Sequence, residues 1–205
     1  MGAHSFLFGL AVGSLASYFL LRGQAWVKDK EVLSRVLFAA DFAAKKHKDQ
    51  RRKDPEATPY VNHPIGVALS LVEEGGVTDC RCLVSALLHD TVEDTDTTFE
   101  EIEKAFGSEV RHCVQELTDD KTLPAAERKL RAIQSAPTKS LAAKTVKMAD
   151  LLYNLRDIQR VIPHEWDQHR ALAYFDWAEK VYCGLRGTNS GLERELDQVI
   201  KQRLG

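Results

Sequence analysis

The sequence contains few cysteines, and the four that it has do not form a disulfide pattern. Cys80, Cys82, Cys113 and Cys183 are too few and too widely spaced for a disulfide framework in a chain of 205 residues. The C-x-C spacing of the first two also differs from the C-x2-C spacing of common zinc sites. We therefore expect reduced, buried thiols in a domain that faces the cytosol.

An excess of charge of either sign is also missing. The chain has 28 Lys and Arg residues against 30 Asp and Glu residues, which gives a formal net charge of −2. A surface built for the backbone of a nucleic acid would be strongly basic, so we expect no nucleic-acid partner. Any anionic ligand must instead be bound by a local group of cations.

Alternating strand patterns, internal repeats and low-complexity tracts are absent as well. Apolar residues recur instead at spacings of three and four, which is the signature of amphipathic helices. The length fits one domain of ordinary size. We predict an all-α fold, a single helical bundle of about 8–10 helices, that occupies residues 27–205 and follows a hydrophobic N-terminal segment, residues 1–26.

Turn and capping residues divide this domain into segments. Gly75-Gly76 ends a helix, Thr98-Phe99-Glu100-Glu101 is a capping box that starts one, and Gly107 closes it. Seven expected helices cover about residues 27–48, 64–74, 79–88, 99–106, 108–117, 124–136 and 140–161. Two more follow: an aromatic-rich helix after Pro163 that includes Trp166, and a last helix from about Asn189. The apolar face of the first expected helix contains Val32, Leu33, Val36, Leu37, Ala40 and Ala43. The apolar face of the second contains Ile65, Val67, Ala68, Leu69, Leu71 and Val72.

The N-terminal segment differs in composition from the rest of the chain. Residues 5–21 form a nearly unbroken apolar run that ends at Arg22 and is followed by Lys28 and Lys30. About seventeen residues is the lower limit for a helix that spans a bilayer. Because the positive charges follow the run, we expect an uncleaved anchor that leaves the main domain in the cytosol, tethered to an intracellular membrane. A buried appendage, a disordered one and a gene-model extension are the alternatives.

The most informative stretch is the end of the helix that reaches Leu88. His89 and Asp90 point about 100° apart on a helix, so both reach one metal ion most easily where the helix ends. Glu93 and Asp94 follow about one turn later, within reach of a water on that metal. A helix end with an acidic solvated loop is the alternative, but it does not account for a histidine at the edge of an apolar stripe.

Two more segments offer metal donors. His63 stands at the start of a helix, after a basic stretch that ends in Arg51-Arg52-Lys53. Asp150 lies inside the apolar run of residues 140–161, where a carboxylate is costly unless it is charge-paired or bound to a metal. A salt-bridged core acid is the alternative for Asp150.

Together these donors form a mixed site of two imidazoles and two carboxylates. Such a fairly hard set with open coordination positions suits Mn²⁺ or a similar ion, which turns a bound water into a nucleophile near neutral pH. Glu93 and Asp94 are placed to transfer the proton, and the basic stretch to neutralise phosphate charge.

These motifs, in this order, resemble those of the HD-domain metal-dependent phosphohydrolases, and more narrowly the hydrolase domain of the RelA/SpoT alarmone enzymes in its small stand-alone animal form. The resemblance covers about residues 33–203. It is carried by Arg51-Arg52-Lys53, Pro59-Tyr60-Val61-Asn62-His63-Pro64, Leu88-His89-Asp90-Thr91-Val92-Glu93-Asp94-Thr95 and Lys147-Met148-Ala149-Asp150-Leu151-Leu152-Tyr153-Asn154-Leu155.

The resemblance implies functions for some residues of these motifs and for two residues further along the chain. One Mn²⁺ is expected on His63, His89, Asp90 and Asp150, with Glu93 and Asp94 in catalysis. Substrate contacts are expected from Arg52, Lys53, Asn154, Arg170 and Tyr174. The sequence departs from the family pattern at Ala125 and Leu152, where the relatives have basic residues, and both changes bear on substrate affinity rather than on the chemistry.

The resemblance also implies an activity. The expected reaction is hydrolysis of the 3′-pyrophosphate of guanosine 3′,5′-bis(diphosphate), ppGpp, to GDP and pyrophosphate in a starvation response. Removal of the 2′-phosphate of NADPH is the alternative within the same chemistry. A membrane-tethered nucleotide sensor without turnover, and a scaffold that uses the basic stretch, are alternatives of other classes. The sequence does not determine the oligomeric state.

Overall fold

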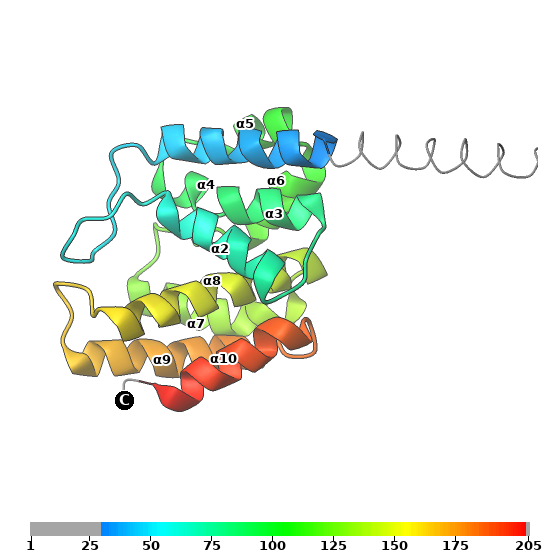
Figure 1. Cartoon of the computed structure of the whole chain (residues 1–205). Helices are drawn as coiled ribbons and strands as arrows, with labels where there is room; N and C mark the ends of the chain where they lie inside the picture. Colours follow the sequence, from blue (N-terminus) through cyan, green and yellow to red (C-terminus); the bar gives the residue numbers. More distant parts are fainter. Residues whose placement is uncertain (1–29, 204–205) are drawn as a thin grey trace, which may run out of the picture.

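Amphipathic helices build residues 30–203, the part of the chain that the computed structural model describes (Figure 1). No strand occurs in this part, where one isolated bridge pairs Arg51 with Pro59. The all-α prediction is therefore confirmed. The predicted anchor, residues 5–21 within the N-terminal segment 1–26, lies outside the described residues. Within residues 30–203, no helix combines the length and the apolar character needed to cross a membrane.

The helices follow the expected order closely. After a helix over residues 30–46 come α2 (Asn62–Glu73), α3 (Cys80–Leu88), α4 (Thr91–Asp94), α5 (Phe99–Phe106), α6 (Ser108–Leu117), α7 (Ala125–Ser135), the 3-10 turn η1 (Ala136–Thr138), α8 (Leu141–Arg160), α9 (Gln168–Cys183) and α10 (Ser190–Gln202).

Side-chain caps explain why several helices begin where they do. Thr98 accepts a hydrogen bond from the backbone N–H of Glu101 at the start of α5, as the capping box predicts. Ser140 and Asn189 cap α8 and α10 in the same way. Gly107, with a φ of 94°, ends α5 in a conformation that favours glycine.

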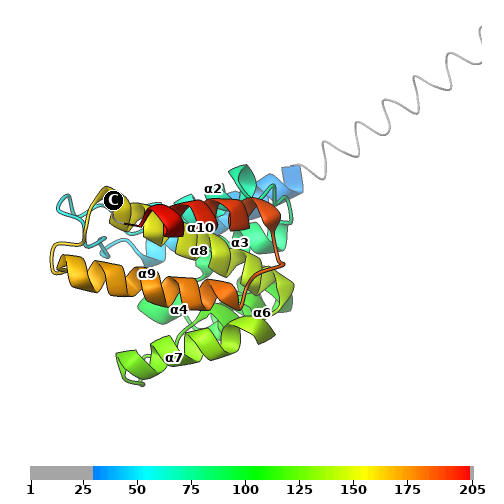
Figure 2. The same ribbon diagram turned by 90° about the horizontal axis from the view of Figure 1, so that it is seen from below.

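Helix α8 lies at the centre of the bundle. It contacts α2, α3, α6, α9 and α10, and Figure 2 shows it between α10 and α9. Its fully buried residues include Val146, Met148, Leu151, Leu152 and Leu155, which belong to the larger of two apolar clusters. The smaller cluster joins α3, α5 and α6 to the helix over residues 30–46 through Ala39.

The buried faces of the first two helices are narrower than predicted. Of the predicted positions, Ala43 is buried in the first helix, and Val67 and Leu71 are buried in α2; Ala39, which the prediction did not include, is buried as well. The predicted faces also included side chains that are at least two-fifths exposed, namely Leu33, Leu37, Ile65, Leu69 and Val72. Periodicity finds an apolar stripe, but how much of the stripe is buried depends on which helices pack against it. Trp166 also lies outside the helix predicted to contain it, in the turn before α9.

Two long connections meet at one end of the bundle. The segment between the first helix and α2, and the segment between α8 and α9, lie together at the left of Figure 1. The backbone N–H of His164 donates to the carbonyl of Lys53 at 3.0 Å and joins the two segments. A cavity opens at this end of the molecule.

Candidate metal and phosphohydrolase site

His63 lies in the first turn of α2, where Pro64 is tolerated because its missing N–H needs no intrahelical partner. The side chain is buried, and its ring packs against those of His89 and Tyr153. Nε2 of His63 lies 3.4 Å from Oδ2 of Asp90 and 3.3 Å from Oδ1 of Asp150. One imidazole thus faces both carboxylates.

His89 and Asp90 occupy the break between α3 and α4, as the sequence predicted. The hydroxyl of Thr91 donates to the carbonyl of Leu88 and stabilises this break. Nδ1 of His89 lies 2.8 Å from the carbonyl oxygen of Ala86, which requires the proton to be on Nδ1. Nε2 is then the ring nitrogen that could bind a metal ion, and it lies 3.0 Å from Oδ2 of Asp90.

Asp150 comes to this point from the buried face of α8. Its Oδ2 accepts from Nζ of Lys147 at 2.8 Å, and its Oδ1 accepts from the amide of Asn154 at 2.7 Å. Oδ1 also lies 3.8 Å from Nε2 of His89. The charge-paired and the metal-bound interpretations of Asp150 are therefore compatible in this geometry.

Neighbouring opposite charges control the protonation of Asp90, Asp150 and His89. Burial alone would raise the pKa of Asp90, but His89 and His63 hold it well below the usual range. Lys147 and the two histidines do the same for the pKa of Asp150. Burial would lower the pKa of His89, yet the two carboxylates raise it well above its usual value. Both acids are thus anionic, the state that a metal ligand requires.

The donor set fits a divalent metal ion. Donor atoms of His63, His89 and Asp90 lie within 4.8 Å of one another, and Asp150 adds the short distances given above. Nε2 of His89 is buried without a hydrogen-bond partner among the described residues, so it is available to an ion. The mixed imidazole and carboxylate set suits Mn²⁺ and similar ions.

Glu93 and Asp94 lie on the single turn of α4, next to these donors. Oε2 of Glu93 accepts from the backbone N–H of Asp119 at 3.0 Å. Burial, together with Asp90, raises the pKa of Glu93 to about 7 despite that hydrogen bond. Asp94 accepts from Lys121 and from Gln50. Glu93 can therefore exchange a proton near neutral pH.

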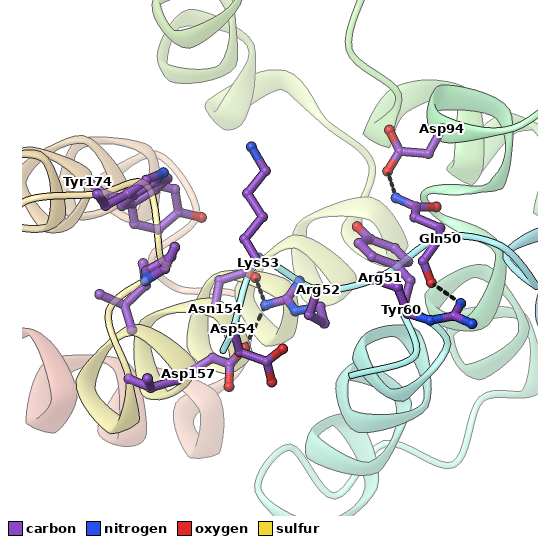
Figure 3. Close-up of a pocket in the computed structure, with 14 residues that line it drawn as sticks. Gln50, Arg51, Arg52, Lys53, Asp54, Tyr60, Asp94, Asn154, Asp157 and Tyr174 are labelled. Carbon is purple, nitrogen blue, oxygen red and sulfur yellow. Dashed lines mark hydrogen bonds and ion pairs between the residues drawn. The ribbon is translucent and has the colours of Figure 1, made fainter. Parts of the chain in front are cut away.

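A cavity of about 380 Å³ opens beside these side chains (Figure 3). Its walls come from the two long connections and from α4, α8 and α9. The lining residues are Gln50, Arg51, Arg52, Lys53, Asp54, Tyr60, Asp94, Asn154, Asp157, Ile158, Val161, Pro163, Trp166 and Tyr174. The volume suits a small molecule.

Four of the five predicted substrate contacts line this cavity. The guanidinium of Arg52 already donates hydrogen bonds to Asn154 at 3.0 Å and to Asp157 at 2.8 Å, so it is less available to a substrate. Lys53 is more available, with a side chain 65% exposed and only a 3.7 Å pair with Glu165. Tyr174 is directed into the same space from α9 (Figure 3).

The fifth predicted contact does not line the cavity, and neither do the two positions at which the sequence departs from the family pattern. Arg170 is not a lining residue, and its guanidinium stacks on Trp166 at 4.7 Å from the ring centre. Leu152 is fully buried in the core of α8. Ala125 is the exposed first residue of α7. All five predicted substrate contacts, and the effects expected of Leu152 and Ala125 on substrate affinity, remain predictions.

The sequence prediction missed several side chains that form hydrogen bonds with the proposed metal ligands and with Asp94. Tyr60 donates its hydroxyl to Asp90 at 2.6 Å. Lys147 could have been found as the i, i+3 partner of Asp150 on one helix. Gln50 and Lys121 gave no local signal, because each meets Asp94 across a large separation in sequence.

Comparison with known proteins gives consistent matches. A family model described as "HD domain" matches residues 39–187. A human protein named guanosine-3′,5′-bis(diphosphate) 3′-pyrophosphohydrolase MESH1 is 58% identical over 83% of this chain and 95% of its own length. The Drosophila melanogaster protein of that name is 52% identical over 83% of this chain and 95% of its own length.

Solved structures match as well. A structure titled "A metazoan ortholog of SpoT hydrolyzes ppGpp and plays a role in starvation responses" superposes with a TM-score of 0.81 at 50% identity. It covers 83% of this chain and 97% of its own. The lmo0812 protein of Listeria monocytogenes gives a TM-score of 0.61 at 28% identity, over 72% of this chain and 98% of its own.

Proposed function

The chain belongs to the HD-domain family, among the RelA/SpoT-type hydrolases that include the animal MESH1 proteins, and from this premise we propose that it hydrolyses ppGpp to GDP and pyrophosphate. The observation that carries the proposal is the convergence of His63, His89, Asp90 and Asp150 beside a cavity whose lining includes Arg51, Arg52 and Lys53. A starvation response is the physiological setting that we propose.

We propose one Mn²⁺ as the cofactor, held by these four side chains. When bound, the ion would polarise a phosphate oxygen and make water a better nucleophile. Nδ1 of His89 donates to the carbonyl of Ala86, which leaves Nε2 as the ring nitrogen that would hold the ion. Lys147 and Asn154 orient the carboxylate of Asp150, and Tyr60 orients that of Asp90.

Glu93 and Asp94 supply the proton transfers. Water attacks the phosphorus attached to the ribose 3′-oxygen, and the bond between these two atoms breaks. One carboxylate accepts a proton from the water, and a carboxylic acid gives a proton to the departing 3′-oxygen. A pKa of about 7 allows Glu93 to hold or release this proton at neutral pH.

Cations at the cavity would bind the phosphates. Lys53 is the freer of the two predicted contacts from the basic stretch, because Arg52 already pairs with Asp157. Asn154, Tyr174 and Arg170 are proposed as further contacts, the last of them through a rearrangement from its stack on Trp166. No nucleic acid is needed as a partner.

The decisive experiment measures hydrolysis of ppGpp and of NADPH, side by side, by the purified protein with Mn²⁺. We expect pyrophosphate and GDP from ppGpp. Faster release of phosphate from NADPH would move the assignment to a 2′-phosphatase. Binding of both nucleotides without turnover of either would favour a sensor and contradict the proposal.

The metal assignment has a separate test. Asp150→Asn should remove both Mn²⁺ binding in calorimetric titration and hydrolysis, because it replaces one of four ligands while keeping the side-chain volume. Asp176→Asn, an exposed acid on α9, is the matched control and should bind the ion normally. Full Mn²⁺ affinity in the Asp150 variant would exclude Asp150 as a ligand.

A further inference from the structure

A buried histidine and a glutamine stand beside the site without a role in the reaction described above. His47 follows the first helix and is 2% exposed. Its Nδ1 lies 2.6 Å from Oε1 of Gln50. Gln50 in turn donates from Nε2 to Oδ2 of Asp94 at 2.8 Å (Figure 3). The three side chains form one hydrogen-bonded chain that ends on a proposed catalytic carboxylate.

The orientation of the Gln50 amide follows from the groups at its two ends. An amide oxygen only accepts, so Nδ1 of His47 must carry the proton in this contact. Burial lowers the pKa of His47, and the ring is therefore neutral at pH 7, with Nε2 unprotonated. The reversed amide would place its oxygen against the carboxylate of Asp94 and leave two acceptors facing each other.

The surroundings of His47 hold its ring in place. The ring packs against Tyr60 with centroids 4.9 Å apart. Tyr60 also donates to Asp90, one of the proposed ligands. The same aromatic pair thus borders the metal donors and the side chain that contacts Asp94. A displacement of His47 would affect both groups.

We propose that Gln50 is a positioning residue for Asp94, and that His47 fixes the direction of the Gln50 amide. This inference rests on the proposed hydrolase function. Lys121, the other donor to Asp94, has a side chain 48% exposed, so it is less constrained than Gln50. Gln50 is the donor that sets the direction of the carboxylate toward the cavity.

The backbone of Gln50 makes hydrogen bonds that do not involve its side chain. Its backbone N–H donates to His47, and its backbone carbonyl accepts from Tyr60 and Arg51. Substitution of the side chain leaves these backbone bonds possible. His47→Phe keeps an aromatic ring against Tyr60 and removes the ring nitrogens, and because the phenyl ring is larger, its free energy of unfolding is measured together with kcat. These variants therefore separate positioning from folding.

The test measures kcat, KM and Mn²⁺ content of Gln50→Ala, Gln50→Glu and His47→Phe with ppGpp. We expect both Gln50 variants to lose kcat on the order of 10- to 100-fold, as for loss of a hydrogen bond to a charged group. KM should stay within about twofold, because a positioning residue acts on the chemical step. His47→Phe should lose less, and Gln115→Ala, at an exposed position on α6, should lose nothing.

Each other outcome has a clear meaning. Wild-type kcat in the Gln50 variants overturns the inference, and so does a raised KM at unchanged kcat, which would make Gln50 a substrate contact. An unreactive wild-type protein would instead refute the proposed function. In that case the ¹⁵N NMR shifts of the His47 ring decide: protonation on Nδ1 alone supports the inference, and protonation on Nε2 overturns it.

Discussion

Glu93 differs from the other carboxylates of the site in what surrounds it. Asp90 and Asp150 face histidines or a lysine, whereas Glu93 has a backbone N–H at one oxygen and Lys121 only at 4.0 Å. Burial therefore dominates and raises its pKa to about 7. Glu93→Gln should keep Mn²⁺ yet lower kcat about 100-fold or more, the range for lost acid–base help. A wild-type rate in this variant with bound Mn²⁺ would exclude Glu93 from proton transfer.

The same burial has a consequence for stability. The unfolded carboxyl releases its proton near pH 4.5, but folded Glu93 keeps it to about 7, so the metal-free protein loses stability as pH rises between these values. Gln does not titrate. Metal-free Glu93→Gln should therefore match the wild type below about pH 4.5 and exceed it by up to about 3 kcal/mol at about pH 8 in urea unfolding. Equal stability at the higher pH would contradict the raised pKa of Glu93.

The sequence predicted the metal-binding and catalytic residues of the site better than the side chains that contact them. Asp150 is an acid within an apolar helix, and His89 is a histidine at the end of one. Each is a polar residue among apolar neighbours and is therefore noticeable in a single sequence. The partners of such residues are ordinary. Gln50 meets Asp94 across 44 positions, and nothing local to either residue predicts that contact.

At the scale of helices, the approach of α2 to α8 brings His63 to Asp150. Gly66 makes this approach possible, because a Cβ atom there would lie 1.9 Å from Cε2 of Tyr153. Tyr153 packs against His63 as well. Gly66→Ala should therefore push the two helices apart and weaken both packing and metal binding.

The expected cost of Gly66→Ala is about 1–3 kcal/mol of unfolding free energy, as for overpacking in a core. Weaker Mn²⁺ binding should accompany it in calorimetric titration. Leu69→Ala, an exposed change on the same helix, is the control and should alter neither quantity. Unchanged metal affinity in the Gly66 variant would show that the helices do not need this close approach.

Helix ends were predictable because caps are local. Thr98, Ser140 and Asn189 each bond to a backbone N–H three residues ahead, so the signal lies within one turn. Buried faces were less predictable, because Leu69 and Leu71 are equally apolar and only the tertiary packing exposes one of them. Trp166 illustrates a related limit: Asp167 caps α9, and the helix therefore begins after the tryptophan.

For the whole molecule, the first question is where the chain resides. Residue 30 and the cavity loops lie at opposite ends of the helix over residues 30–46 (Figure 1), so an N-terminal tether would leave the cavity accessible. The anchor predicted from the sequence implies full-length protein in the membrane fraction of cells and protein without residues 1–24 in the supernatant, with equal rates of hydrolysis. Soluble full-length protein would rule out a spanning helix.

The second question is what the metal does for the fold. The proposed ligands come from α2, the break between α3 and α4, and α8, so one ion would connect three elements that separate on unfolding. An ion bound only by the folded state adds about 2.7 kcal/mol at one hundred times its Kd. For a chain of this size we expect Tm to rise by about 5–10 °C. Thermal unfolding with Mn²⁺ and with a chelator measures this shift, and Asp150→Asn should reduce it. An unchanged Tm in the wild type would mean that the four side chains do not share one ion.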